Sequence, residues 1–379
     1  MRIIIVGTAF PYRGGLAAYN ERLAREYLKQ GHEVEIMTFK LQYPAFLFPG
    51  KSQYSTEFSP NDLKISRNIH SMNPINWINV GRSIKKKSPD MVIFCYWMAF
   101  MAPCFGTIAR FARLPKTKMV AMIHNMIPHE PSILDKLFPK YFVKAMDGFV
   151  AMAESVLDDI NQFDKENKPK VVSPHPIYDH YGEAITKKEA SVKLGLFAHK
   201  NYVLFFGFIR QYKGLDLLLE AFADKRLRQF PVKLIVAGEF YENPAPYLQQ
   251  IIRLGLDEVV ELRTKFIPDN EVRNYFSIAD LVAQPYRTAT QSGVSQIAYH
   301  FEKPMLVTNV GGLAEIIPNG KVGYVVEVDP KQIADSLVDF FLNQRSEMMI
   351  ENIKIEKKKF LWSRMTDAID GLFNAIPKS

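Results

Sequence analysis

Arg210 and Lys213 stand in a short glycine-bearing turn between an apolar run and an amphipathic segment. The apolar run at 203–206 suits a buried parallel strand, and residues 215–222 carry apolar side chains at helical spacing. A helix that begins directly after such a turn offers free backbone N–H groups and the positive end of its dipole to an anion. The pattern therefore predicts a phosphate-binding turn, and the alternative is a pair of solvated loop cations.

The segments that follow this turn predict a complete parallel sheet around it. Short apolar runs alternate with helical stretches, which favours a doubly wound α/β domain. The predicted strands of this domain lie at 203–206, 232–237, 259–262, 281–284, 305–308 and 323–326.

The first half of the chain repeats the same layout. Residues 2–6 predict a strand, residues 7–15 a long turn, and the following segment a helix with Tyr19 and Leu23 on one face. A second strand at 34–39 completes a β-α-β unit with the usual right-handed connection. Further strands are predicted at 91–95, 118–123, 148–152 and 170–172.

The length of 379 residues suits two domains. We expect an N-terminal Rossmann-like domain at 1–175, a linker at 176–190 after the proline-rich segment Ser173–Tyr178, and a C-terminal Rossmann-like domain at 191–356. A final helix within 357–379 is expected to cross back to the first domain. The two strand edges would then border a crevice.

Composition describes a soluble globular protein, with 47% hydrophobic and 23% charged residues. Residues 1–180 hold 23 basic and 16 acidic residues, a difference of +7 out of a total of +8. This asymmetry predicts an anionic partner such as a membrane surface or a lipid diphosphate. No nucleic-acid motif accompanies it, so nucleic acid is not expected as a partner.

The two cysteines, Cys95 and Cys104, fit neither a disulfide framework nor a metal-ligand spacing. We therefore expect a cytoplasmic protein without a bound metal and, because the apolar run after Met1-Arg2 is short, without a signal peptide. The uncharged stretch 91–109 is interpreted as two short buried elements and not as a membrane span.

A nucleotide dehydrogenase is the first function to exclude. The turn at 7–15 lacks the GxGxxG spacing, and Phe39-Lys40 stands at the end of the second strand where a ribose would need an acid.

The sequence resembles, over nearly its full length, the retaining glycosyltransferases of family 4, which have the GT-B architecture of two facing Rossmann-like domains. The resemblance rests on five motifs together. They are Pro11–Gly15, Ile123–Pro128, Lys213-Gly214, Gln284-Pro285, and Lys303–Gly312 followed by Glu315.

The resemblance implies roles for particular residues. Gly14 and Gly15 would lie against the donor, and Lys213 would contact its diphosphate. Arg210 would replace the family's usual arginine, whose position is Phe208 here, because a long forked side chain can reach the same phosphate. His124, at a strand end, would lie near the transferred sugar, although a lone histidine there also suits a purely structural role.

The resemblance also implies a nucleobase segment and an acceptor side. The segment at Lys265, Phe266 and Ile267 would receive the nucleobase, and the acceptor side would include Tyr12, Arg13 and His129. The aromatic, proline-broken segment 41–54, with Phe46 and Phe48, is predicted to form an acceptor or membrane-contact surface. The alternative is a loop folded onto its own domain.

One departure concerns the pair of glutamates that many family members carry below the donor. Ala289 and Ile297 occupy those positions. The turn into the next helix offers hydroxyl, amide and backbone N–H groups to the diphosphate and sugar instead. These donor-binding candidates are Gln291, Ser292, Gly293 and Val294. A pseudo-enzyme with a decayed donor site is the alternative.

The resulting prediction is a metal-independent, retaining glycosyltransferase with no cofactor, and His124, Lys213 and Arg210 as catalytic candidates. It would move a hexose from a nucleotide diphosphate sugar to a glycan or lipid-linked acceptor in polysaccharide or lipopolysaccharide synthesis, at the inner face of the cell membrane. Two rivals remain: a nucleotide-sugar 2-epimerase of the same fold and a nucleotide-sugar-binding scaffold.

Overall fold

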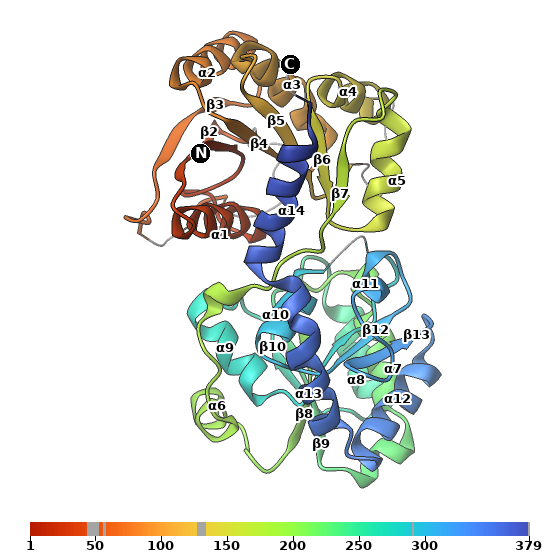
Figure 1. The fold of residues 1–379 in the computed structure, drawn as a ribbon. Coiled ribbons are helices and arrows are strands. Elements are labelled where there is room, and N and C mark those ends of the chain that lie inside the picture. The colour runs from red at the N-terminus through yellow and green to blue at the C-terminus, as the bar shows by residue number, and fades with distance from the viewer. Residues whose placement is uncertain (44–52, 56–57, 127–133, 290–291, 378–379) are drawn as a thin grey trace. The chain divides into compact units, whose positions relative to one another are not determined.

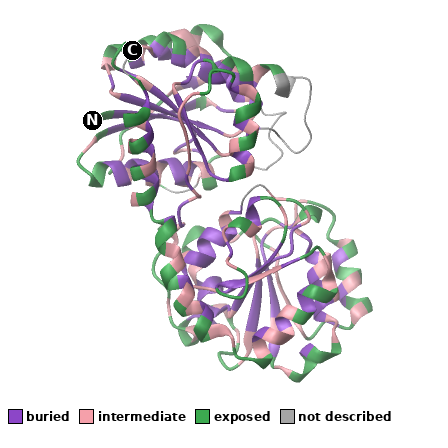
Figure 2. Cartoon of the chain, turned by 45° about the vertical axis from the view of Figure 1, so that its right-hand side comes forward, coloured by how far each residue is buried: buried purple, intermediate pink, exposed green. Residues whose placement is uncertain are grey.

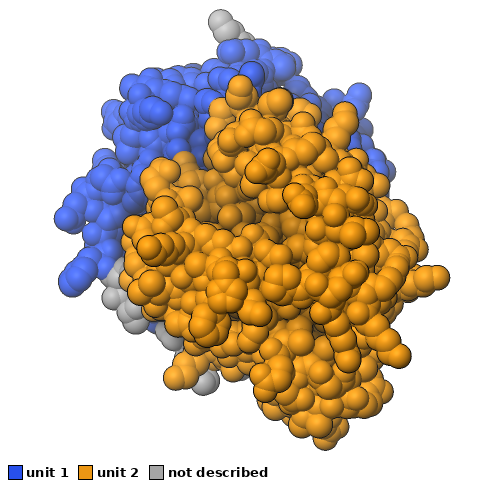
Figure 3. Space-filling model, turned by 90° about the horizontal axis from the view of Figure 1, so that it is seen from below, with its two compact units in different colours: residues 1–175, 362–379 blue, residues 176–361 orange. Residues whose placement is uncertain are grey.

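The computed structural model describes residues 1–43, 53–55, 58–126, 134–289 and 292–377. The chain forms two compact units (Figures 1 and 3). Unit 1 comprises Met1–His175 together with Trp362–Ser379, and unit 2 comprises Pro176–Leu361. The C-terminal segment from Trp362 therefore belongs to the same compact unit as the N-terminal half of the chain.

Unit 1 is built on a parallel sheet of seven strands in the order β3-β2-β1-β4-β5-β6-β7. Strand β1 lies between β2 and β4, which places the β-α-β unit of the N-terminus inside the sheet, next to the edge strand β3. The strands are β1 Arg2–Val6, β2 Glu33–Leu41, β3 Ile65–His70, β4 Met91–Tyr96, β5 Lys118–Ile123, β6 Gly148–Ala151 and β7 Lys170–Val172.

Helices cover both faces of this sheet (Figure 1). Ile3 and Ile5 pack with α1 and α14, whereas Ile4 and Val6 pack on the opposite face with α2, α3, α4 and α5. Burial on both faces explains the continuous apolar runs of these strands. The helices are α1 Gly15–Lys29, α2 Pro74–Lys87, α3 Ala102–Ala112, preceded by the short η2 Ala99–Met101, α4 Leu134–Val143, α5 Glu154–Phe163 and α14 Trp362–Ala375.

Strand β3 was not predicted from the sequence. Its central residues Ser66, Arg67 and Asn68 are polar, and it pairs only with β2 at the edge of the sheet. An edge strand needs less apolar surface than a central one, so its sequence carries a weak signal.

Unit 2 contains a parallel sheet of six strands in the order β10-β9-β8-β11-β12-β13. Residues 176–190, which were expected to act as a linker, lie within this unit and include η3 and the start of α6. The strands are β8 Asn201–Phe206, β9 Val232–Ala237, β10 Val260–Arg263, β11 Leu281–Gln284, β12 Met305–Thr308 and β13 Gly323–Val326.

The helices of unit 2 lie between its strands and pack on both faces of the sheet, which is buried at its centre (Figure 2). The prediction of two doubly wound parallel-sheet domains is confirmed. The helices are η3 Asp179–Tyr181, α6 Lys187–Leu194, η4 Gln211–Lys213, α7 Leu215–Phe222, η5 Lys225–Gln229, α8 Ala245–Leu254, α9 Asp269–Ile278, α10 Gly293–His300, α11 Gly312–Glu315, α12 Pro330–Leu342, α13 Ser346–Glu356 and η6 Lys357–Phe360.

Helix α14 packs on the sheet of unit 1 beside α1. Its residues Trp362, Met365, Ile369 and Leu372 are buried there, and Gln30 Nε2 donates a hydrogen bond of 2.7 Å to Thr366 Oγ1. The uncharged stretch 91–109 forms β4 and the first part of α3. In the part of the chain that the structure describes, no helix has the length and apolar character needed to span a bilayer.

Candidate functional site

In unit 2, the turn after β8 depends on two glycines with positive φ. A Cβ at Gly214 would lie 1.9 Å from the backbone oxygen of Pro285, and the φ of Gly214 is 67°. Gly207 has φ 95°, and a Cβ there would lie 3.1 Å from Lys213 Nζ. Only glycine fits such positions. The turn is thereby pressed against the carboxyl end of β11, which places Lys213 at the carboxyl edge of the sheet.

Lys213 is half-buried and has no ion pair with any carboxylate among the described residues. Its Nζ lies 5.4 Å from the ring centroid of Tyr286. Burial lowers the pKa of the Lys213 ammonium, and the neighbouring charge of Arg210 acts in the same direction. A desolvated cation without a partner is costly in a folded protein, so this position suits a bound anion.

Arg210, in the same turn, is exposed, and its guanidinium carbon lies 4.8 Å from the ring centroid of Tyr241. The aromatic ring orients the side chain without neutralising its charge. Arg287 differs, because it forms a bidentate pair with Asp216 at 2.6 and 2.8 Å that neutralises its charge. Arg210 and Lys213 are thus the cations of this turn that remain open to a ligand within the described ranges.

Helix α10 begins beside this turn, at the carboxyl end of β11. Ser292 Oγ accepts a hydrogen bond from Val294 N at 3.3 Å and caps the helix. A Cβ at Gly293 would approach the ring of Tyr178 to 2.7 Å, so the helix start packs closely on that segment. Gln291 lies outside the described residues.

The two positions that lack the family's glutamates differ in their surroundings. Ile297 is buried in the core of unit 2, and Ala289 packs partly buried against the same core. Neither position supplies a polar group. Lys265 and Phe266 follow β10 at the same edge of the sheet, and both are exposed.

In unit 1, Gly14 and Gly15 stand at the N-terminus of α1, where Gly14 has φ 104°. The loop that leads to them is held by three side chains that belong to none of the sequence motifs. Thr38 Oγ1 accepts a hydrogen bond from Ala9 N at 3.0 Å, and Asn20 Nδ2 donates one to Thr8 O at 2.8 Å. Glu21 Oε1 also accepts one from Phe10 N at 2.8 Å.

The described end of the predicted acceptor loop lies against the same turn. Arg13 N donates to Gln53 O at 3.0 Å, and Ser55 N donates to Pro11 O at 2.8 Å. The rings of Tyr12 and Tyr54 lie 5.4 Å apart. Gln53–Ser55 therefore forms one wall of the turn that carries the glycine pair. Phe46 and Phe48 lie outside the described residues.

His124 follows β5 at the carboxyl edge of the unit 1 sheet, and its backbone N donates to Tyr96 O at 2.8 Å. Its ring packs at 4.8 Å against Tyr19, and His175 lies 6.3 Å away. Nε2 is buried and has no hydrogen-bond partner among the described residues. Burial, with a smaller contribution from His175, lowers the pKa of His124 to about 3. The imidazole is therefore neutral near pH 7. His129 lies outside the described residues.

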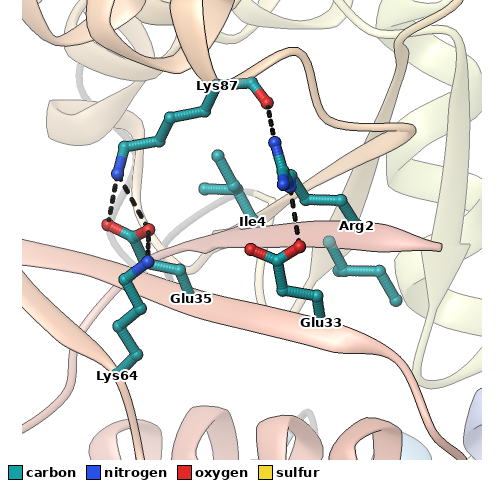
Figure 4. A pocket seen from close by; sticks show the side chains of 7 residues that line it. Arg2, Ile4, Glu33, Glu35, Lys64 and Lys87 are labelled. Carbon is teal, nitrogen blue, oxygen red and sulfur yellow. Dashed lines mark hydrogen bonds and ion pairs between the residues drawn. The ribbon is translucent and has the colours of Figure 1, made fainter.

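A charged pocket of about 170 Å³ occurs at the amino ends of β1 and β2. Its cations and carboxylates neutralise each other: Lys87 Nζ lies 2.9 Å and Lys64 Nζ 3.2 Å from Glu35, and Arg2 Nε lies 2.9 Å from Glu33 (Figure 4). The candidate site residues of unit 1 lie at the opposite, carboxyl edge of the sheet. We therefore assign the ion pairs of this pocket to the stability of the fold.

Two family models match the chain. One, described as Glycosyltransferase Family 4, matches residues 13–179, and the other, described as Glycosyl transferases group 1, matches residues 200–343. An uncharacterised glycosyltransferase of Methanocaldococcus jannaschii is 24% identical over 387 residues, covering 99% of each chain.

Solved structures match the chain over almost its whole length. Sucrose-phosphate synthase of Thermosynechococcus elongatus has a TM-score of 0.73 at 15% identity, with 99% of each chain covered. The HepE protein of Anabaena, solved with UDP-glucose, has a TM-score of 0.72 at 16% identity, again with 99% of each chain covered. These structures confirm the predicted GT-B fold. Because the two family models together match most of both units, the chain belongs to the group 1 glycosyltransferases of family 4.

Proposed function

We propose that this glycosyltransferase moves a hexose from a nucleotide diphosphate sugar to an acceptor hydroxyl, with retention of the anomeric configuration. The observation that carries the proposal is Lys213, a half-buried cation without a carboxylate partner in the described chain, held at a strand-to-helix turn. The HepE structure with UDP-glucose supports a donor of this chemical class.

The proposed chemistry follows from where charge develops. The bond between the sugar's anomeric carbon and the diphosphate oxygen breaks, which leaves negative charge on the diphosphate and positive charge on the ring. Lys213 and Arg210 would stabilise the diphosphate. The acceptor oxygen bonds to the anomeric carbon, and the products are the glycosylated acceptor, the nucleoside diphosphate and one proton. The two protein cations supply the charge stabilisation that a divalent metal supplies elsewhere, so we propose a metal-independent reaction.

We assign His124 to the transferred sugar. Its neutral ring can accept or donate a hydrogen bond to a hydroxyl group but cannot act as a cation near pH 7. The side chain would therefore orient the sugar and would not neutralise the diphosphate.

For the acceptor we propose a glycan or a lipid-linked sugar, used in polysaccharide or lipopolysaccharide synthesis. Tyr12, Arg13 and the Gln53–Ser55 wall would shape this side, whereas Gly14 and Gly15 would lie against the donor. We propose a cytoplasmic location, at the inner face of the membrane. Its support is that Cys95 and Cys104 are both buried free thiols, as expected in a reducing compartment.

Incubation with a panel of nucleotide sugars tests the proposal. We expect slow release of nucleoside diphosphate from one donor, unaffected by EDTA and accelerated by the correct acceptor. NMR of the glycosylated product should show the donor's anomeric configuration. Conversion of the donor to an epimer would identify an epimerase, and binding without any turnover would identify a scaffold; either result contradicts the proposal.

A further inference from the structure

Three neighbouring helices on one face of the unit 1 sheet carry positive charge with almost no acidic residues. The sequence of α2 contains Arg82 and three successive lysines and no acid, and α3 contains Arg110 and no acid. Helix α4 has Lys140 in its last turn, and Lys144 follows it. Helix α2 packs beside α3, and α3 beside α4 (Figure 1). We call the outer surface of these three helices the basic helical face.

The charge of this face is not neutralised by neighbours. Lys85, Lys86, Lys140 and Lys144 are exposed, and none forms an ion pair with a described carboxylate. Arg110 donates only to two backbone carbonyl groups and therefore keeps its charge. Two cations at the ends of these helices differ and are not counted in the basic helical face: Lys87, the last residue of α2, and Arg113, which follows α3, each have a carboxylate partner within 3 Å.

Large apolar side chains protrude between these cations. Ile75 is 72% exposed and Leu137 57% exposed. Phe111 and Tyr141 are exposed as well, and the guanidinium carbon of Arg110 lies 3.8 Å from the ring centroid of Tyr141. A surface that interleaves cations with exposed aliphatic and aromatic groups fits the boundary between lipid headgroups and acyl chains.

We propose that the basic helical face docks on a bilayer that contains anionic lipid. The lysines pair with the headgroup phosphates, and Ile75 and Leu137 enter the acyl boundary. A nucleic acid fits less well, because the two most exposed apolar groups of these helices are aliphatic and offer no ring on which a base can stack. This surface differs from the aromatic segment 41–54, and it does not depend on the reaction proposed above.

Vesicle co-sedimentation tests the proposal. The chain should bind vesicles of phosphatidylcholine with about 30% phosphatidylglycerol at low salt, and much less at about 1 M salt. It should bind pure phosphatidylcholine weakly. The variant with Lys85, Lys86, Lys140 and Lys144 all replaced by Glu should lose binding at least about tenfold, because each cation near the surface contributes separately. Ile75→Ser with Leu137→Ser should weaken binding without changing its salt dependence.

A charge-matched control uses four exposed lysines of unit 2, each replaced by Glu: Lys188, Lys193, Lys225 and Lys331. This variant has the same net charge as the first but should keep vesicle binding. Unchanged thermal unfolding and nucleotide affinity in both variants would show that the folds are intact. Equal losses in the two variants, no preference for anionic vesicles, or binding of RNA in place of vesicles would each overturn the proposal.

Discussion

His124 is the side chain whose properties depend most on its surroundings. An exposed histidine titrates near neutral pH, but burial against Tyr19 keeps this one uncharged. Its Nε2 has no hydrogen-bond partner in the described chain, and a buried polar atom of this kind is uncommon in folded proteins. A sugar hydroxyl at this atom would satisfy it. The orphan atom gives the sequence-based assignment a physical reason.

We expect His124→Ala to lower turnover more than it lowers affinity for the bare nucleoside diphosphate, because the nucleotide lacks the sugar that the ring would contact. Loss of one such hydrogen bond in the transition state corresponds to about 1–2 kcal/mol, or about tenfold in kcat/KM. Steady-state kinetics and nucleotide calorimetry on the same preparation measure both quantities. Equal losses in turnover and nucleotide affinity would contradict the assignment.

At the scale of elements, the loop before the glycine pair is held by β2 and α1. Thr38 Oγ1 accepts the hydrogen bond of Ala9 N, and both residues are buried. A backbone N–H left unpaired in the interior costs about 1–3 kcal/mol. The loop therefore depends on a residue outside its own sequence.

Thr38→Val keeps the shape of the side chain but removes the acceptor. We expect the free energy of unfolding to fall by about 1–2 kcal/mol and turnover to fall with it, because the glycine pair moves. Thr117→Val is the matched control: its buried hydroxyl donates to Pro89 O at 2.6 Å, away from the loop. That variant should lose stability without losing turnover. Full activity in Thr38→Val as well as in Thr117→Val would contradict the claim that the hydrogen bond from Ala9 N to Thr38 positions the glycine pair.

The charged pocket at the amino ends of the strands predicts a pH-dependent stability. Burial raises the pKa of Glu35, but hydrogen bonds from Ser66, Lys87 and Lys64 outweigh it, so the pKa is lowered overall. A carboxylate whose pKa is lowered on folding stabilises the fold above its unfolded pKa and loses this effect as pH falls through the folded pKa.

Glu35→Gln should therefore cost about 1–2 kcal/mol at pH 7, and its difference from the parent should shrink below about pH 4.5. Denaturant unfolding across a pH series measures this. Glu33→Gln is the control, because its pair with Arg2 is exposed and worth well under about 1 kcal/mol. A cost for Glu35→Gln that stays constant down to pH 3 would refute the explanation.

The sequence predicted the central strands well because each is a short apolar run buried on both faces, with a clear start and end. Strand β3 was not predicted because it lies at the edge of the sheet, where polar residues are tolerated and the apolar pattern is weak. The hydrogen bonds of Thr38, Asn20 and Glu21 with the loop before the glycine pair were not predicted either, because no local sequence motif links β2 to this loop. One signal was available: Asn20 is a polar residue at helical spacing from the apolar Ala17, Leu23 and Ala24 of α1.

At the scale of the whole chain, each unit presents its candidate residues at the carboxyl edge of its own parallel sheet. This is where ligands bind in open α/β sheets, because glycine-bearing turns and helix N-termini meet there. Unit 2 offers the cations of the β8–α7 turn, and unit 1 offers a neutral imidazole and the glycine pair. We expect the cations of unit 2 to bind a diphosphate and the neutral imidazole of unit 1 to contact a sugar hydroxyl.

The absence of carboxylates at Ala289 and Ile297 has a consequence for donor binding. We expect the donor to be held chiefly through its diphosphate and base, since the core position of Ile297 offers no partner to a hydroxyl group. The cations of unit 2 should then dominate nucleotide affinity.

Calorimetric titration of UDP into the parent chain and into Lys213→Ala tests the central claim most directly, with Lys225→Ala as a control for loss of one exposed lysine of unit 2. Loss of a charge-assisted contact of about 1.5–3 kcal/mol predicts at least tenfold weaker binding for Lys213→Ala. Lys225→Ala should bind like the parent. If Lys213→Ala binds UDP as tightly as the parent does, the diphosphate is bound elsewhere and the assignment of this turn is wrong.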